Sequence, residues 1–234
     1  MTAIIVKQEL NSLADSPKGK ILSRFFKTGP GEYGEGDIFL GIKVPDERRV
    51  ARKYRSLPLG EVTKLLQSKI HDHRQTALFI LVDQFQKADP DLQKKIYQLY
   101  LDNTQHINNW DLIDCSAPKI VGDYLLDKSA ERKILYKLAK SKILWERRIA
   151  ILTTYTFIKG DQFDDTLKIA ELLLHDEHDL IHKAVGWMLR EVGKKDQKIE
   201  EKFLKKYYRE MPRTMLRYAI EKFPEEKRQS YLKK

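Results

Sequence analysis

Cysteine is almost absent from this sequence, since Cys115 is the only one in 234 residues. An internal disulfide is therefore impossible, and the composition favours a reducing compartment. No apolar run is long enough to cross a bilayer, and the first residues lack the charged start and apolar core of a signal peptide. We therefore expect a cytoplasmic protein with no membrane partner.

Strand-like patterns are also missing. No segment alternates polar and apolar residues with a period of two, whereas residues such as Leu78, Leu81 and Phe85 recur at helical spacing. Proline follows Asp89 and Met211, at points where new helices are expected to begin. The sequence therefore predicts an all-α fold.

A cation recurs near the start of every second predicted helix. Arg74, Arg148, Lys183 and Arg217 each precede a small apolar run, and with Asp111 as the second member of the series the intervals are 34 to 37 residues. This interval is close to that of helical repeats. We therefore predict a right-handed solenoid of antiparallel helix pairs (HEAT-like repeats) with a basic concave groove, as a single domain. The domain spans 1–234, and the predicted pairs are 72–88 with 90–101, 110–126 with 130–140, 143–158 with 163–174, 179–192 with 198–209, and 212–223 with 225–232.

Glycine is concentrated in one segment, 27–41, which we predict to be a loop. The segment lacks the preceding strand and the Gly-Lys-Ser/Thr ending of phosphate-binding loops. Two interpretations stay open: the loop carries Tyr33 and Phe39 to a ligand, or it is a plain connector.

Metal-binding patterns are scarce. There is no cluster of cysteines, and His178 and His182 share a helical face without a third convergent ligand. These histidines are better explained as residues at the start of a helix. We predict neither a metal nor a cofactor.

Acidic residues are outnumbered, with 34 Asp and Glu against 44 Lys and Arg, for a formal net charge of +10. Such an excess favours phosphate-rich partners, because their counterions are released on binding. A surface that is basic only for solubility explains the same composition. Charge alone therefore leaves nucleic-acid binding open.

Trp110 and Asp114 are four residues apart, so on a helix the indole and the carboxylate share a face. They interrupt the cation series at Asp111, and Asn108 or Asn109 is positioned to cap their helix. In one interpretation the pair performs chemistry. In the other, Trp110 belongs to the core and one of the two aspartates forms an ion pair between repeats.

The repeated cations also allow two interpretations. They bind phosphates, or a ladder of ion pairs between adjacent repeats occupies Arg74, Arg148 and Lys183. Of the other tryptophans, Trp145 is expected in the core, whereas Trp187 stands where the preceding repeat has an aliphatic residue.

The sequence resembles the AlkD-like DNA alkylation repair family, a group of DNA glycosylases built from HEAT-like repeats. One departure is Asn109-Trp110, where some relatives carry two tryptophans. The matching segments cover almost the whole chain: Phe-Phe-Lys-Thr-Gly-Pro-Gly-Glu-Tyr-Gly at 25–34, Asn-Trp-Asp-Leu-Ile-Asp at 109–114, Trp-Glu-Arg-Arg-Ile-Ala-Ile-Leu at 145–152, His-Lys-Ala-Val-Gly-Trp-Met-Leu-Arg-Glu at 182–191 and Met-Pro-Arg-Thr-Met-Leu-Arg-Tyr-Ala at 211–219.

This resemblance implies a monofunctional glycosylase that removes cationic alkylated purines, N3-alkyladenine and N7-alkylguanine, from double-stranded DNA in base excision repair. It places the catalytic carboxylate at Asp114, the flanking indoles at Trp110 and Trp187, and a DNA-gripping arginine at Arg148. We expect a monomeric, nucleoid-associated enzyme that leaves the base outside any deep pocket. Further phosphate contacts are expected at Arg190, Arg213 and Arg217.

Two other functions remain as alternatives. Because some family members have lost the activity, the chain is alternatively a non-catalytic HEAT-repeat protein that binds damaged or branched DNA. A protein-binding HEAT adaptor is the third possibility, although it leaves the basic series without a purpose.

Overall fold

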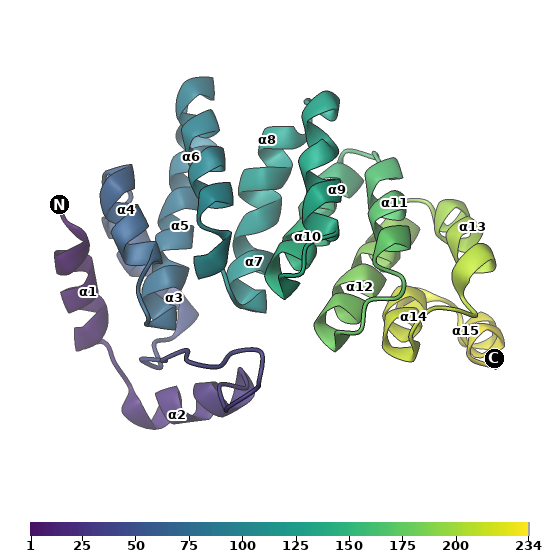
Figure 1. Cartoon of the computed structure of the whole chain (residues 1–234), viewed down its shortest axis with the longest axis horizontal. Helices are drawn as coiled ribbons and strands as arrows, with labels where there is room; N and C mark the ends of the chain where they lie inside the picture. The colour runs from purple at the N-terminus through teal and green to yellow at the C-terminus, as the bar shows by residue number, and fades with distance from the viewer. Residues whose placement is uncertain (234) are drawn as a thin grey trace. The chain divides into compact units, whose positions relative to one another are not determined.

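The computed structural model describes residues 1–233, and these residues form helices without a named strand (Figure 1). A single isolated bridge pairs Ile38 with Ile70. The all-α prediction is confirmed. The chain forms two compact units, Met1–Ile120 and the residues from Val121 onward, which are described separately. The prediction of a single domain stays a prediction.

The first unit is organised around one central helix, α5. This helix packs against α1, α3, α4, α6 and α7. It is buried over most of its circumference, and a helix with neighbours on several sides carries apolar residues all round. The helices of this unit are α1 (Ala3–Ser12), α2 (Ser16–Phe25), α3 (Val44–Lys53), α4 (Leu59–Leu66), α5 (His71–Lys87), α6 (Pro90–Asp102) and α7 (Trp110–Ala117).

The glycine-rich segment lies in the connection between α2 and α3, at one end of the central helix (Figure 1). The first turn of α5 anchors it: the Asp72 carboxylate accepts hydrogen bonds from the backbone N–H groups of Leu40 at 2.8 Å and Ile42 at 3.0 Å. Between them Gly41 has a φ of 84°, a conformation that disfavours residues with a Cβ. The end of the loop is therefore fixed to the core.

In the second unit, helix pairs stack on one another. The first helix of one pair contacts the first helix of the next, so α10 packs on α12 and α12 on α14, while α11 and α13 pack beside their own partners. This is the contact pattern of helical repeats. The helices are α8 (Asp123–Leu125), α9 (Lys133–Ala139), α10 (Leu144–Lys159), α11 (Asp164–Leu172), α12 (Asp179–Lys195), α13 (Gln197–Tyr207), α14 (Arg213–Ala219) and α15 (Glu225–Leu232).

Gly186 explains how α12 and α14 approach so closely. A Cβ at this position would overlap the carbonyl oxygen of Met215 and the Cβ of Tyr218. Because those atoms belong to backbone or lie close to it, no side-chain rotation relieves the overlap. The absence of a side chain at Gly186 therefore sets the spacing of these two helices.

The predicted helix 110–126 is observed as one helical run, but its hydrogen-bond pattern changes along its length. The α-helix ends at Ala117, a π-helical turn follows over Pro118–Gly122, and α8 begins at Asp123. Pro118 has no N–H to continue the α-helical hydrogen bonds, so a π-helical pattern replaces them, although the dihedral angles of Pro118 stay in the α region. The other predicted helices lie within a few residues of the observed ones. Within residues 1–233, no helix combines the length and the apolar character that a membrane span needs.

Candidate functional site

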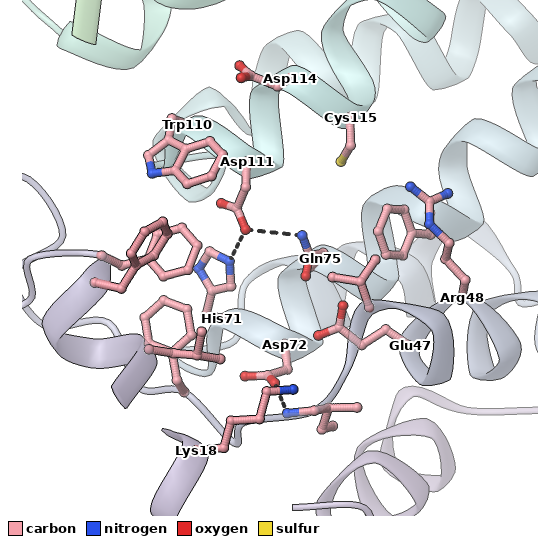
Figure 2. Close-up of a pocket in the computed structure, with 17 residues that line it drawn as sticks. Lys18, Glu47, Arg48, His71, Asp72, Gln75, Trp110, Asp111, Asp114 and Cys115 are labelled. Atoms are coloured by element: carbon pink, nitrogen blue, oxygen red, sulfur yellow. Dashed lines mark hydrogen bonds and ion pairs between the residues drawn. The ribbon is translucent and has the colours of Figure 1, made fainter. Parts of the chain in front are cut away.

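A cavity of about 520 Å³ lies in the first unit, with walls from α2, the loop that follows it, α3, α5 and α7 (Figure 2). Trp110 and Asp114 both line it, so the prediction that these two residues share a face is confirmed. The glycine-rich loop contributes Phe39 to the wall, whereas Tyr33 is not among the lining residues. The loop therefore does more than connect two helices.

Stacked aromatic rings form one wall of the cavity. Phe26 lies between Phe39 and Trp110, with centroid distances of 4.8 and 5.2 Å and interplanar angles of 16° and 20°. Phe25 meets the indole edge-on at 6.1 Å and is itself 62% exposed. Trp110 is thus packed on one face and half-buried, so its indole is not fully enclosed in the core, and its role in chemistry stays a prediction.

Beneath this wall, His71 bridges two carboxylates. Its Nδ1 lies 3.2 Å from Asp37 and its Nε2 lies 2.9 Å from Asp111. Burial opposes a charge on the ring, but the charge of Asp111 and the hydrogen bonds with both carboxylates outweigh it and raise the pKa of His71 to about 9. At neutral pH the imidazolium therefore donates both N–H groups.

The Asp37 carboxylate, at the base of the loop, accepts hydrogen bonds from several donors. Arg74 donates to it at 2.7 Å and Asn109 at 3.2 Å, in addition to His71. Burial raises the pKa of the Asp37 carboxyl, but the hydrogen bond from His71 and the charge of Arg74 hold it below its ordinary value. The same Asn109 accepts from the N–H of Trp110 at 2.8 Å, so it caps α7 as predicted.

The two aspartates of α7 have different surroundings. Asp111 accepts hydrogen bonds from His71, from Gln75 at 3.1 Å and from the N–H of Leu112 at 2.9 Å. Figure 2 shows its carboxylate pointing toward His71 and Gln75, whereas Asp114, one turn further along, points away from them. Asp111 is therefore part of the ion-pair network, and Asp114 is the better candidate for contact with a ligand.

Arg74 forms a buried ion pair, although its partner Asp37 belongs to the glycine-rich loop and not to an adjacent helix pair. Its side chain is 3% exposed and also donates to the carbonyl oxygen of Ser68 at 3.1 Å, so it does not face solvent. Lys183 forms an ion pair at 2.6 Å with Asp179 of its own helix, and its side chain is 40% exposed. The recurring position is therefore not one uniform row of phosphate ligands.

The remaining predicted residues belong to the second unit. Arg148 is 4% exposed and donates to the carbonyl oxygen of Leu180 at 2.7 Å, so binding a phosphate requires it to leave that contact. On α12, Trp187 is partly buried and donates to Glu191 at 3.1 Å. Trp145 is buried, which confirms its predicted place in the core.

The other predicted DNA contacts vary in how available they are. Arg190 pairs with Glu221. Arg213 is exposed and donates to the carbonyl oxygen of Leu232 at 2.8 Å. Arg217 is exposed and has no hydrogen-bond or ion-pair partner among residues 1–233. A contact with DNA stays a prediction for all three arginines. Arg217 is the one that could bind a phosphate without first breaking an existing contact.

Sequence reasoning missed Glu47, which lines the cavity from α3 and is 1% exposed. Burial, reinforced by the negative charges of Asp72 and Asp111, raises the pKa of Glu47 to about 9, so the carboxyl is neutral at pH 7. Its Oε2 has no hydrogen-bond partner among the described residues. The signal was hidden because Glu47 stands in a run of charged residues, Asp46-Glu47-Arg48-Arg49, that resembles a solvated face.

Two histidines of the second unit, His178 and His182, lie at the start of α12. His178 accepts a hydrogen bond from the N–H of Leu180 at 3.1 Å at the N-terminus of α12, and the His182 ring contacts the carbonyl oxygen of Asp176. Across residues 1–233, no group of three or more His, Cys, Asp or Glu side chains is arranged to hold a metal ion. The Cys115 thiol lines the cavity, and burial raises its pKa, so it is a poor nucleophile.

Comparison with known proteins gives one family and one fold. A family model described as "DNA alkylation repair enzyme" matches residues 6–223. A solved structure described as a predicted DNA alkylation repair enzyme from Enterococcus faecalis matches with a TM-score of 0.70 and 16% sequence identity, over 90% of this chain and 96% of that one. No curated protein sequence matches the chain. The structural match supports the fold, and the family match extends over both units.

Proposed function

Because the chain belongs to the DNA alkylation repair enzyme family, we propose that it is a monofunctional DNA glycosylase, which hydrolyses the N-glycosidic bond of cationic N3-alkyladenine and N7-alkylguanine. The observation that carries the proposal is the placement of Trp110 and Asp114 together on α7, at a cavity in a strongly basic protein. Family membership supports the broader role in repair of alkylated DNA.

The reaction needs little from the protein besides electrostatics. Alkylation makes the purine a cation, so when the bond from C1′ to the base nitrogen breaks, the electron pair leaves with a neutral base. The sugar becomes oxocarbenium-like, and water adds to C1′ and loses a proton. The Asp114 carboxylate stabilises the positive sugar and orients that water. The indole face of Trp110 favours a cationic purine, and we propose the same chemistry for Trp187.

Binding to duplex DNA rests on the net charge of +10 and on exposed cations. Arg213 and Arg217 hold phosphates, which position the duplex without reading its sequence. Arg148 and Arg190 join them only after they leave Leu180 and Glu221. The working protein is a nucleoid-associated monomer.

The test is release of free 7-methylguanine from methylated duplex DNA in the presence of a chelator. Wild-type protein releases the base, and Asp114→Asn slows release by about 10²-fold or more while DNA binding persists, because only the charge near the sugar is lost. If no alkylbase appears at any salt concentration, the proposal is wrong for these lesions. Tight binding to branched or bulged DNA with intact alkylbases supports the non-catalytic alternative.

A further inference from the structure

Helix α2 exposes two large apolar side chains next to the candidate site. Ile21 is 67% exposed and Phe25, one helical turn later, is 62% exposed, so both lie on one face of the helix. Single exposed apolar residues are ordinary, but an adjoining group of them is typical of an interaction surface. Phe25 and Val44, which is 43% exposed, both line the cavity that contains Asp114. The exposed apolar surface of α2 therefore reaches the candidate site.

The opposite side of α2 is packed against the end of the glycine-rich loop. A Cβ at Gly19 would lie 2.5 Å from the carbonyl oxygen of Phe39, so the two backbones are in close contact. The N–H of Asp15 donates to the carbonyl oxygen of Leu40 at 2.8 Å, and the Asp15 carboxylate caps the helix through the N–H of Lys18 at 3.1 Å. These contacts hold α2 in one orientation, so its apolar side stays exposed in the free protein.

Cations flank the apolar residues of this helix. Residues 16–31 contain four Lys or Arg and no Asp or Glu. Lys20 and Arg24 are exposed, and their side chains have no hydrogen-bond or ion-pair partner among residues 1–233. Unpaired cations favour a polyanion, because binding releases its counterions. The surface formed by Lys20, Ile21, Arg24 and Phe25, which we call the α2 face, therefore fits a partner that offers both negative charge and apolar contact.

Duplex DNA offers both along its minor groove. The groove is about 6 Å wide, the phosphates of two strands border it, and proteins that bind there place apolar side chains in it between cations. An anionic membrane offers similar charges, but binding of a helix to a membrane scales with buried apolar area, of which two side chains supply little. The ring centres of Phe25 and Trp110 are 6.1 Å apart, which also places the α2 face beside the candidate site for DNA.

We propose that the α2 face binds the minor groove of duplex DNA beside the lesion, with Ile21 and Phe25 in the groove and Lys20 and Arg24 on the flanking phosphates. The inference rests on the proposed glycosylase function and adds a contact of the first unit with its substrate. Because adenine N3 faces the minor groove, N3-alkyladenine carries its alkyl group on the side of the duplex that α2 contacts. The α2 face holds the duplex and not the alkylated base, so no base needs to enter the cavity.

The first test uses a duplex with a tetrahydrofuran abasic-site analogue, which cannot be hydrolysed, and measures binding by fluorescence anisotropy at several salt concentrations. We expect Ile21→Ser to weaken binding by about tenfold without changing the slope of log binding constant against log salt, because the lost contact is apolar. Arg24→Gln should instead reduce that slope by about one. Because Ile21 is exposed, Ile21→Ser removes no buried group and should unfold at the wild-type temperature.

A matched control comes from the first helix of the same unit. Ile4 on α1 is 66% exposed, nearly the same as Ile21, so Ile4→Ser removes an equally exposed side chain away from the α2 face. It should bind the duplex with wild-type affinity. Equal affinity in Ile21→Ser and Ile4→Ser overturns the proposal.

A second test identifies the groove. Inosine in place of guanine next to the analogue removes the amino group that projects into the minor groove, whereas 7-deazaguanine alters only the major-groove edge. Wild-type protein should prefer the inosine duplex by about threefold, because Ile21 and Phe25 cannot accept a hydrogen bond from the amino group. Ile21→Ser should lose this preference. A preference of the same size in wild type and Ile21→Ser, or a response to 7-deazaguanine alone, overturns the proposal.

The same variant separates other partners and the proposed function. Cosedimentation with phosphatidylserine vesicles, or a dimer in size-exclusion chromatography, that is lost in Ile21→Ser while DNA affinity stays unchanged overturns the proposal in favour of a membrane or a second copy. Wild-type protein that releases alkylbases, with Ile21→Ser binding the duplex equally well, overturns the α2 contact alone. Protein whose DNA binding depends on Ile21 but which releases no alkylbase overturns the glycosylase function alone.

Discussion

Replacing Glu47 by Gln should stabilise the protein increasingly as the pH rises. Glu47 is buried and its pKa is about 9 in the folded chain against an ordinary 4.5. The unfolded chain therefore loses this proton above pH 4.5, while the folded chain keeps it until about pH 9. Unfolding releases a proton throughout that window, so stability falls as the pH rises. Gln has nearly the same shape and does not ionise, so the variant escapes this loss.

The size of this stabilisation follows from the pH interval between the two pKa values of Glu47. Each pKa unit corresponds to about 1.4 kcal/mol, so at pH 7 the ionisation of unfolded Glu47 costs the wild type about 3 kcal/mol. Between pH 5 and pH 8 the stability difference between Glu47→Gln and wild type should grow by about 4 kcal/mol. The contributions of other titrating groups, such as His71, cancel in this difference because both proteins contain them.

Urea denaturation followed by circular dichroism at pH 5, 6, 7 and 8 measures this difference. Glu200→Gln provides a matched comparison in the second unit, where burial and the charge of Glu201 raise the pKa of Glu200 to about 8. The stability difference between Glu200→Gln and wild type should therefore stop growing one pH unit earlier than that of Glu47→Gln. Parallel stability curves for wild type and Glu47→Gln across this range would refute the reasoning. That result would mean that Glu47 reaches water in the folded protein.

Three further predictions concern packing and charge. Arg74→Leu should cost about 3–5 kcal/mol of stability in urea denaturation, because Asp37 loses a buried partner. Lys87→Leu, which removes an exposed pair with Asp83, should cost less than about 0.5 kcal/mol. Equal losses in the two variants would contradict this prediction. Gly186→Ala should lower stability by about 1–3 kcal/mol, while Gly60→Ala, whose Cβ meets nothing within 4 Å, should not; a neutral Gly186→Ala would show that α12 and α14 separate freely. Arg217→Ala should reduce the slope of log binding constant against log salt for duplex DNA by about one, and an unchanged slope would remove it from the interface.

Local patterns predicted the helices well, because the information lies within a few residues. The apolar spacing around Leu78 and Phe85 marked α5, and the four-residue interval between Trp110 and Asp114 was enough to place both on the cavity. Pro118 was visible in the sequence as well. Its effect on 110–126 was missed because the apolar pattern continues through it.

The ion-pair network could not be predicted in the same way. His71 meets Asp37 and Asp111 across 34 and 40 residues, and no periodicity within one helix links such positions. Glu47 is a similar case, since its neighbours in sequence are charged and only the packing of α3 against α5 buries it. The run of six polar residues that opens α5, 71–76, was the one available signal, because polar side chains there precede the apolar stretch 77–82.

The anchoring of Asp37 separates the glycine-rich loop into two parts with different freedom to change. Downstream, Phe39 is fixed between the Asp37 ion pairs and the Asp72 hydrogen bonds. Upstream, Gly31 is exposed with φ of 76° and has nothing within 4 Å of the place where a Cβ would stand. The tip around Gly31 is therefore a suitable point to lengthen the chain or attach a fluorescent probe without moving the cavity wall.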